Sequence, residues 1–136
     1  MKDKVFVDSN IWLYLFGNDA AKKQVALKFL SQDCYISTQI VAENINVCIR
    51  KFKLTAPEVE QHAKNLISLC QVKLIHPSTI ELALKISSRH QYSFYDSLVL
   101  ASALETDCRI LYSEDLQDGQ VIEGKLKIVN PFIATV

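Results

Sequence analysis

Residues 5–10 read Val-Phe-Val-Asp-Ser-Asn, which places an acid directly after three apolar residues and before two small polar ones. A short apolar run that ends in polar residues is typical of a strand buried in a parallel sheet. Asp and Ser are both favoured at helix N-caps. The stretch therefore predicts a strand over residues 4–8, followed by a helix that begins at Ser9 or Asn10 and ends at Phe16.

Short apolar runs and helix-length segments alternate along the rest of the chain. Further strands are expected at residues 34–36, 72–75, 109–112 and 127–129, with a short edge strand or extended loop at 121–122. Helices are expected at residues 19–31, 37–52, 55–70, 78–89 and 93–105, the third and fourth opening with capping boxes at Thr55 and Ser78 and the last with a similar motif at Ser93. Strands that alternate with helices predict an α/β fold with a mainly parallel sheet covered on both faces.

The bulk composition is that of one ordinary globular domain, expected to span residues 1–136. Fifteen basic and fifteen acidic residues give a formal net charge of zero, which argues against a strongly basic nucleic-acid coat protein. No stretch approaches the ~20 apolar residues of a membrane span, and the N-terminus lacks the apolar region of a signal peptide. We expect a soluble cytoplasmic protein that does not contact a membrane.

Cysteine and histidine show no metal-ligand spacing. The four cysteines, none in a C-x-x-C pair, lie in or beside apolar runs, which favours buried reduced thiols over a zinc or disulfide framework. His62, His76 and His90 are scattered, so surface or packing roles are expected for each.

Four acids lie beside segments that are expected to be buried: Asp8, Glu43, Asp96 and Asp115. Each borders an apolar strand or the apolar side of a helix. A carboxylate beside a core is costly unless it is paired or binds a cation. One shared cation site at the carboxyl ends of the strands explains the four acids more simply than four separate accidents.

Each acid also has an ordinary interpretation. Asp8 can cap a helix, and Asp96 can act as a first-turn acid that the helix dipole stabilises. Glu43 can be a solvated boundary residue near Arg50, and Asp115 a solvated loop acid. Asp96 is the sharpest case, because the helix that it opens is apolar on almost every side.

Small polar residues accompany the acids. Asn10 can fix the turn after the first strand, and the Ser113 hydroxyl can bond a neighbouring carboxylate while Asp115 points into the site. Asn44 falls within the apolar sector of its helix, which predicts a buried partner or an interface. Glu114 is a weaker candidate for an auxiliary role.

In order and spacing, these residues resemble the PIN-domain ribonucleases, and most closely the VapC-type toxins of bacterial toxin–antitoxin pairs. The resemblance covers essentially the whole chain and is carried by residues 5–10, Glu43, Tyr95-Asp96, residues 111–116, and the tail from Gly119 to Phe132.

The resemblance implies a PIN-like three-layer α/β/α sandwich with a short, mainly parallel central sheet. It implies that Asp8, Glu43, Asp96 and Asp115 form an acidic quartet that holds Mg²⁺ or Mn²⁺, supported by Ser113 and Asn10. It also implies an RNA substrate, a homodimer, and inhibition by a small antitoxin protein.

The residues support the same chemistry without the family name. Carboxylates are suitable ligands for Mg²⁺, which can activate water for in-line attack on a phosphodiester. Glu43 could bind the ion directly or orient the water. No Ser-His-Asp or Cys-His arrangement competes with metal-assisted hydrolysis, so the chain is expected to be a hydrolase. The resemblance implies that this hydrolase is an endoribonuclease.

Two basic segments are candidates for RNA contact. The first contains Arg50, Lys51 and Lys53, and the second covers residues 85–90. The alternative for both is a solvated helix end.

Three rival functions were weighed. A haloacid-dehalogenase-type phosphatase needs a second Asp where this chain has Asn10. A response-regulator receiver needs adjacent acids near the first strand and a mid-chain phosphoacceptor Asp, and neither is evident. The serious rival is a non-catalytic PIN-like module that binds RNA or protein without cleaving.

Overall fold

The computed structural model describes residues 3–133; the predicted domain of residues 1–136 also includes 1–2 and 134–136, which lie outside the described residues. The helices are α1 (Ser9–Trp12), the 3₁₀ turn η1 (Leu13–Phe16), α2 (Ala20–Leu30), α3 (Thr38–Arg50), α4 (Ala56–Leu69), α5 (Pro77–His90) and α6 (Phe94–Glu105). The strands are β1 (Val5–Val7), β2 (Tyr35–Ser37), β3 (Gln71–Lys73), β4 (Ile110–Tyr112), β5 (Val121–Ile122) and β6 (Leu126–Val129).

The strands form one six-stranded sheet in the order β3-β2-β1-β4-β6-β5. All neighbours pair in parallel except β5 and β6, which are antiparallel. β1 is central, and Val7 is in register with Tyr112 of β4. The residues that follow these two strands, Asp8 and Ser113, therefore leave the sheet side by side. The mainly parallel sheet and the edge strand at 121–122 are as predicted.

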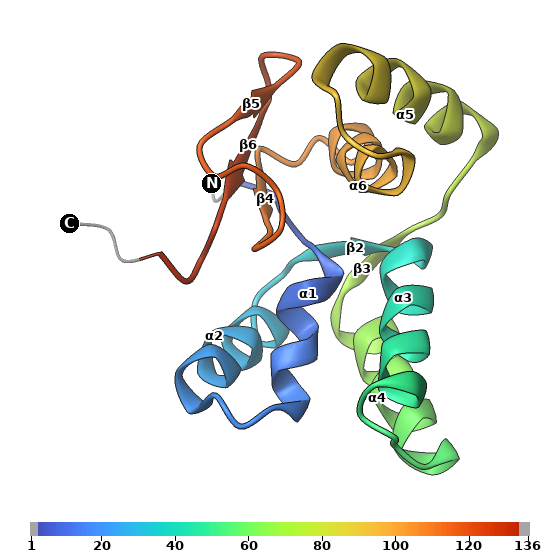
Figure 1. The fold of residues 1–136 in the computed structure, drawn as a ribbon, viewed down its shortest axis with the longest axis vertical. Helices are drawn as coiled ribbons and strands as arrows, with labels where there is room; N and C mark the ends of the chain where they lie inside the picture. Colours follow the sequence, from blue (N-terminus) through green and yellow to red (C-terminus); the bar gives the residue numbers. More distant parts are fainter. Residues whose placement is uncertain (1–2, 134–136) are drawn as a thin grey trace.

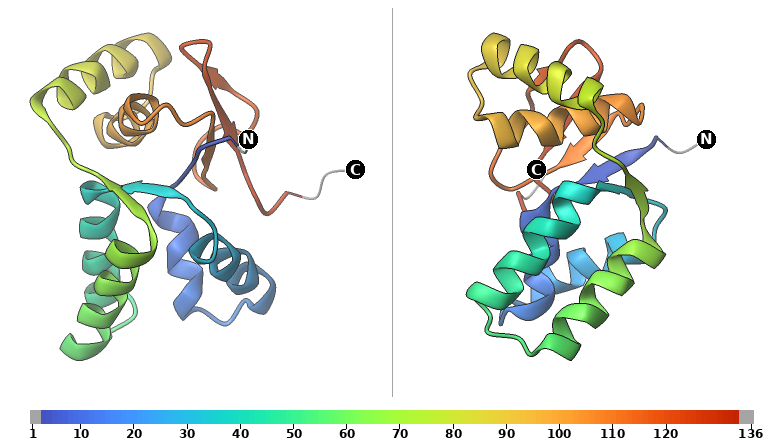
Figure 2. Two further views of the ribbon diagram at one scale, coloured as in Figure 1. Left: turned by 180° about the vertical axis from the view of Figure 1, so that it is seen from behind. Right: turned by 90° about the vertical axis from the view of Figure 1, so that its right-hand side faces the viewer.

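Helices cover both faces of the sheet. Figures 1 and 2 show α5 and α6 on one side and α1 to α4 on the other. The predicted α/β/α sandwich is confirmed. α6 is the most enclosed helix, because every residue from Ser97 to Ala103 is buried, as its apolar sequence predicts.

Most predicted helix starts are confirmed by capping contacts. Asp19, Ser37, Thr55 and Ser93 are the N-caps of α2, α3, α4 and α6, and Thr55 forms a capping box with Glu58. Each satisfies a backbone N–H that the first helical turn leaves unpaired.

The capping box predicted at Ser78 is wrong. The N-cap of α5 is His76, and the Thr79 hydroxyl accepts the His76 backbone N–H at 3.1 Å. Pro77 explains the earlier start, since its fixed φ suits the first helical position and it has no N–H to satisfy. The predicted single helix up to Phe16 also divides, into α1 and the tighter turn η1.

The cysteines behave as the sequence predicts. Cys34, Cys48, Cys70 and Cys108 are all free and buried. None of the helices within residues 3–133 combines the length and the apolar character needed to cross a membrane.

Candidate functional site

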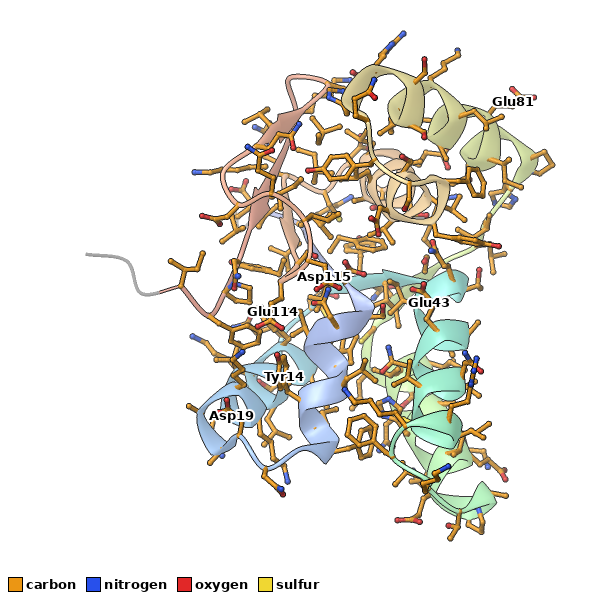
Figure 3. All side chains as sticks on the ribbon, viewed as in Figure 1. Tyr14, Asp19, Glu43, Glu81, Glu114 and Asp115 are labelled. Atoms are coloured by element: carbon orange, nitrogen blue, oxygen red, sulfur yellow. The ribbon has the colours of Figure 1, made fainter. Side chains whose placement is uncertain are left out.

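The four acids predicted to share a site come from four elements. Asp8 follows β1 and Asp115 lies in the loop after β4, whereas Glu43 lies on α3 and Asp96 lies in the first turn of α6. Figure 3 places Glu43 and Asp115 near the same end of α1. Asp8 is buried, Glu43 and Asp96 are half-buried, and Asp115 is exposed. The fold therefore brings residues distant in sequence to one edge of the sheet.

Asp8 is held by hydrogen bonds on both of its carboxylate oxygens. The Ser113 hydroxyl donates to Oδ2 at 2.8 Å, and the Ser9 backbone N–H donates to Oδ1 at 2.7 Å. Asp8 is thus the N-cap of α1 as well as a member of the acidic group. The two interpretations of Asp8 are compatible, because capping fixes the orientation of the carboxylate.

Asn10 bridges the two loops that carry Asp8 and Asp115. Its amide Nδ2 lies 3.1 Å from Asp115 Oδ2 and 3.4 Å from Asp8 Oδ2. Its side-chain Oδ1 accepts the Glu114 backbone N–H at 3.2 Å. The Ser113 hydroxyl also accepts the Asp115 backbone N–H at 3.3 Å. Asn10 and Ser113 therefore lie where supporting residues were expected.

Ser9 connects Glu43 to this group. Its hydroxyl donates to Glu43 Oε1 at 3.0 Å and lies 3.5 Å from Asp8 Oδ1. Asp96 is fixed at its backbone, where its N–H donates to the Ser93 hydroxyl at 3.2 Å.

Repulsion between the acids contributes to the raised pKa values of Asp8 and Glu43. Burial raises the pKa of the Asp8 carboxyl from 3.8 to about 6, and the charges of Glu43 and Asp115 add to this rise, while hydrogen bonds from Ser113 and Ser9 oppose it. Burial also raises the pKa of Glu43, with a further contribution from the charge of Asp96. Each acid is therefore electrostatically coupled to at least one other.

No lysine, arginine or histidine forms an ion pair with any of the four acids within residues 3–133. The uncompensated negative charge and the all-oxygen donor set fit a hard divalent cation such as Mg²⁺. No three His, Cys, Asp or Glu side chains of the described residues are arranged so that they could share one ion. The four acids therefore lie near one another without forming a ready three-ligand set.

The PIN domain family model matches residues 5–117. The chain belongs to the PIN domain family. No curated protein matches this PIN domain by sequence.

Solved structures of similar fold are toxins of toxin–antitoxin systems. One from Mycobacterium tuberculosis, described as the sarcin–ricin-loop-cleaving toxin VapC20, has a TM-score of 0.67 at 21% identity and covers 82% of this chain and 90% of that chain. A toxin–antitoxin complex from Klebsiella pneumoniae has a TM-score of 0.72 at 22% identity, over 95% and 98% of the two chains. DNA-bound VapBC from Salmonella typhimurium has a TM-score of 0.69 at 16% identity, over 93% and 97%. The resemblance to VapC-type toxins is confirmed at the level of fold.

A polar cluster beside the acids was not predicted from the sequence of this PIN domain. Glu114 accepts a hydrogen bond from the Tyr14 hydroxyl and pairs with Lys22, with 2.7 Å between Lys22 Nζ and Glu114 Oε2. The ring of Tyr14 packs edge-on against Phe132, with 5.1 Å between centroids. The cluster ties α2 to the loop that carries Asp115. Because Lys22 and Glu114 are far apart in sequence, no local pattern signals their pairing.

Behind Glu43, a buried hydrogen-bond chain joins three helices. The Asn44 amide Nδ2 lies 3.4 Å from the Ser9 carbonyl oxygen and 3.2 Å from that of Ile40, while Asn44 Oδ1 lies 3.0 Å from His62 Nε2. The buried partner predicted for Asn44 is confirmed. His62 has the packing role expected for it, although its contact with Asn44 was not predicted.

The two basic segments differ in their surroundings. Arg50, Lys51 and Lys53 are exposed at the end of α3 and form no ion pair within the described part of the chain. In the segment 85–90, by contrast, Arg89 and His90 both contact Glu123. The α3 segment is therefore the freer of the two to bind a phosphate.

Proposed function

We propose that this PIN domain is a metal-dependent endoribonuclease that hydrolyses RNA phosphodiester bonds and acts as the toxin of a toxin–antitoxin pair. The proposal is carried by the convergence of Asp8, Glu43, Asp96 and Asp115, none of which pairs with a cation among residues 3–133. Family membership and the toxins of similar fold support it.

In this proposal Asp8, Asp96 and Asp115 hold Mg²⁺ or Mn²⁺. A bound ion would lower the pKa of a coordinated water and offset negative charge on the scissile phosphate. Ser113 and Asn10 keep the Asp8 and Asp115 carboxylates oriented toward one place. Glu43 either binds the ion or orients the attacking water.

The reaction is an in-line displacement at phosphorus. The water oxygen forms a bond to phosphorus while the bond to the leaving ribose oxygen breaks, and the leaving oxygen takes up a proton. In this proposal Glu43 accepts a proton from the water, a role favoured by burial and the charge of Asp96, which raise the pKa of Glu43.

Protein partners are the second part of the proposal. The solved relatives from Klebsiella pneumoniae and Salmonella typhimurium are described as toxin–antitoxin and VapBC complexes. Ile49, Ile67 and Leu69 on α3 and α4 are each more than half exposed. We assign to this chain a small antitoxin, a homodimer and a cytoplasmic location.

The test uses purified protein freed of any co-purifying partner. It is incubated with a pool of cellular RNA in Mg²⁺, in Mn²⁺ or in EDTA, beside an Asp96→Asn variant. Asp33→Asn is the matched control, because Asp33 is an exposed acid outside the site. Discrete cuts that require metal and Asp96 but not Asp33 support the nuclease. Absence of cleavage by folded protein favours the rival, a PIN-like module that binds RNA or protein without cleaving.

A further inference from the structure

A cavity of about 320 Å³ lies beside the acids, between η1 and the end of α3. Its walls include Asn10, Tyr14, Glu114, Lys51 and Phe52. The acidic site does not use this cavity, and its volume exceeds that of a single nucleobase.

Two wall residues connect the cavity to the acids. Asn10 Nδ2 lies 3.1 Å from Asp115 Oδ2, and the side-chain Oδ1 of Asn10 accepts the Glu114 backbone N–H at 3.2 Å. Glu114 directly precedes Asp115. A group that fills the cavity therefore lies one side chain away from the place where a scissile phosphate would bind.

The walls favour a flat, uncharged group inside the cavity. Tyr14 and Phe52 provide aromatic surface. The carboxylate of Asp19 repels a phosphate, while that of Glu114 is already paired with Lys22. Figure 3 shows Tyr14, Glu114 and Asp19 grouped on the same side of α1. Aromatic surface with nearby polar acceptors is how proteins bind unstacked bases of single-stranded RNA.

Among the wall residues that the structure describes, Lys51 is the one cation, and it is exposed. Its Nζ lies 5.6 Å from the centroid of the Phe52 ring, so charge and aromatic surface are adjacent. The adjacent Lys51 and Phe52 side chains suit a nucleotide, since the base can enter the cavity while the phosphate binds Lys51.

We propose that this cavity binds one unpaired nucleobase of the substrate RNA next to the cleaved bond, with Lys51 on the adjoining phosphate. The inference rests on the proposed function, since it names a part of the substrate site of that nuclease. The cavity then helps to choose where the RNA is cut, whereas the four acids cut any phosphodiester placed among them.

Two substitutions fill the cavity without touching the acids. Leu13→Trp enlarges a half-buried wall residue. Gly17→Leu adds a side chain at a wall position where a new Cβ meets no atom within 4 Å and where φ is an ordinary −97°, so it serves if Leu13→Trp does not fold. Leu84→Trp, at an exposed position on α5, controls for the addition of an exposed tryptophan.

Binding is measured by fluorescence anisotropy in the Asp96→Asn background, which prevents cleavage. The probes are labelled single-stranded homopolymers of A, C and U, and an abasic ribose-phosphate oligomer of the same length. We expect at least one base-bearing oligomer to bind about 10-fold more tightly than the abasic one, the scale of one stacked base. Leu13→Trp or Gly17→Leu should remove this difference and leave abasic binding unchanged, and Leu84→Trp should preserve it.

Equal binding of base-bearing and abasic oligomers would overturn the inference. So would unchanged base preference in both filled variants, or loss of binding to a co-purified small protein with RNA binding intact, which would assign the cavity to a protein partner. Base-dependent binding by a protein that cuts no RNA would refute the nuclease but support the cavity. Cleavage of RNA by a protein whose binding does not depend on the base would support the nuclease but refute the proposed role of the cavity.

Discussion

The Nε2 atom of His62 lies 3.0 Å from Oδ1 of Asn44, and both side chains are buried. Burial lowers the pKa of His62, so the imidazole is neutral at pH 7 and can donate to Asn44. The Asn44 amide is then directed to the backbone carbonyl of Ser9, the residue whose hydroxyl donates to Glu43. A histidine on α4 thus positions a carboxylate of the site from behind.

Replacing His62 by alanine should lower both stability and activity. The variant leaves Asn44 without its buried partner, which costs about 1–3 kcal/mol of unfolding free energy. Urea denaturation measures this loss. His62→Gln, which can still donate to Asn44, should recover part of the cleavage rate. If His62→Ala kept the full rate, a positioning role would be excluded.

Asp8 should make the metal-free protein less stable as the pH rises. Because its folded pKa is about 6 and its model value is 3.8, the folded state binds more protons between these values. Stability contributed by the protonated acid is present below pH 4 and lost as pH rises to 6, a loss of about 3 kcal/mol. Asp8→Asn should therefore be the more stable protein at pH 7.

The measurement compares urea unfolding of the wild type and Asp8→Asn in EDTA across this pH range. The comparison cancels the opposite effect of His62, whose lowered pKa removes stability as pH falls. A difference between the two proteins that does not change from pH 4 to pH 7 would contradict the prediction.

Divalent cations should raise the melting temperature of the wild type. An ion that binds only the folded state stabilises it by about 3 kcal/mol when present at 100 times its Kd. The effect should be small in Asp8→Asn and Asp115→Asn but retained in Asp33→Asn. Scanning calorimetry with Mg²⁺ and Mn²⁺ tests this, and equal shifts in all four proteins would indicate nonspecific binding.

Lys22→Met should reduce cleavage without removing any of the four acids. It breaks the contacts of Lys22 with Glu114 and Tyr14 and so loosens the loop that carries Asp115. Because misplacement of a reacting group reduces rate strongly, we expect kcat to fall by about 10-fold with KM nearly unchanged. Lys23→Met, its exposed neighbour, is the control. An unchanged kcat would show that the loop carrying Asp115 keeps its position without Lys22.

Charge reversal at Arg50 or Lys53 should weaken RNA binding. Each lost phosphate contact reduces the slope of log affinity against log salt by about 0.7 for a single strand. Titration of the Asp96→Asn background at several salt concentrations measures this slope. Lys28→Glu, on the exposed side of α2, is the control, and an unchanged slope would count against contact by the α3 segment.

The sequence predicted the layers and the acids because both depend on local pattern. Apolar runs and capping residues define the strands and most helix starts, and parallel strands place their carboxyl ends together. Asp8 follows β1 directly and Asp115 lies in the loop just after β4, so their convergence needs no knowledge of side-chain packing. Predicting that Glu43 and Asp96, which lie on helices, join the site also required helical periodicity and the family resemblance.

Contacts between distant segments could not be read in the same way. Lys22 and Glu114 meet because α2 packs beside the loop after β4, and His62 meets Asn44 because α3 and α4 lie together. Both pairs depend on helix orientation, which hydrophobic periodicity does not specify. At α5 the error was local, since Pro77 outweighed the capping signal at Ser78.

The central position of β1 has a consequence for folding while the protein is being synthesised. The ribosome makes β1 and Asp8 early, but β1 pairs with β4 on one side, and β4 and Asp115 follow only after the six helices α1 to α6 and the strands β2 and β3. Domains generally fold as units during synthesis. A growing chain would therefore carry an incomplete acidic site for most of its translation. Each copy of the proposed nuclease therefore stays inert until its own synthesis is nearly complete.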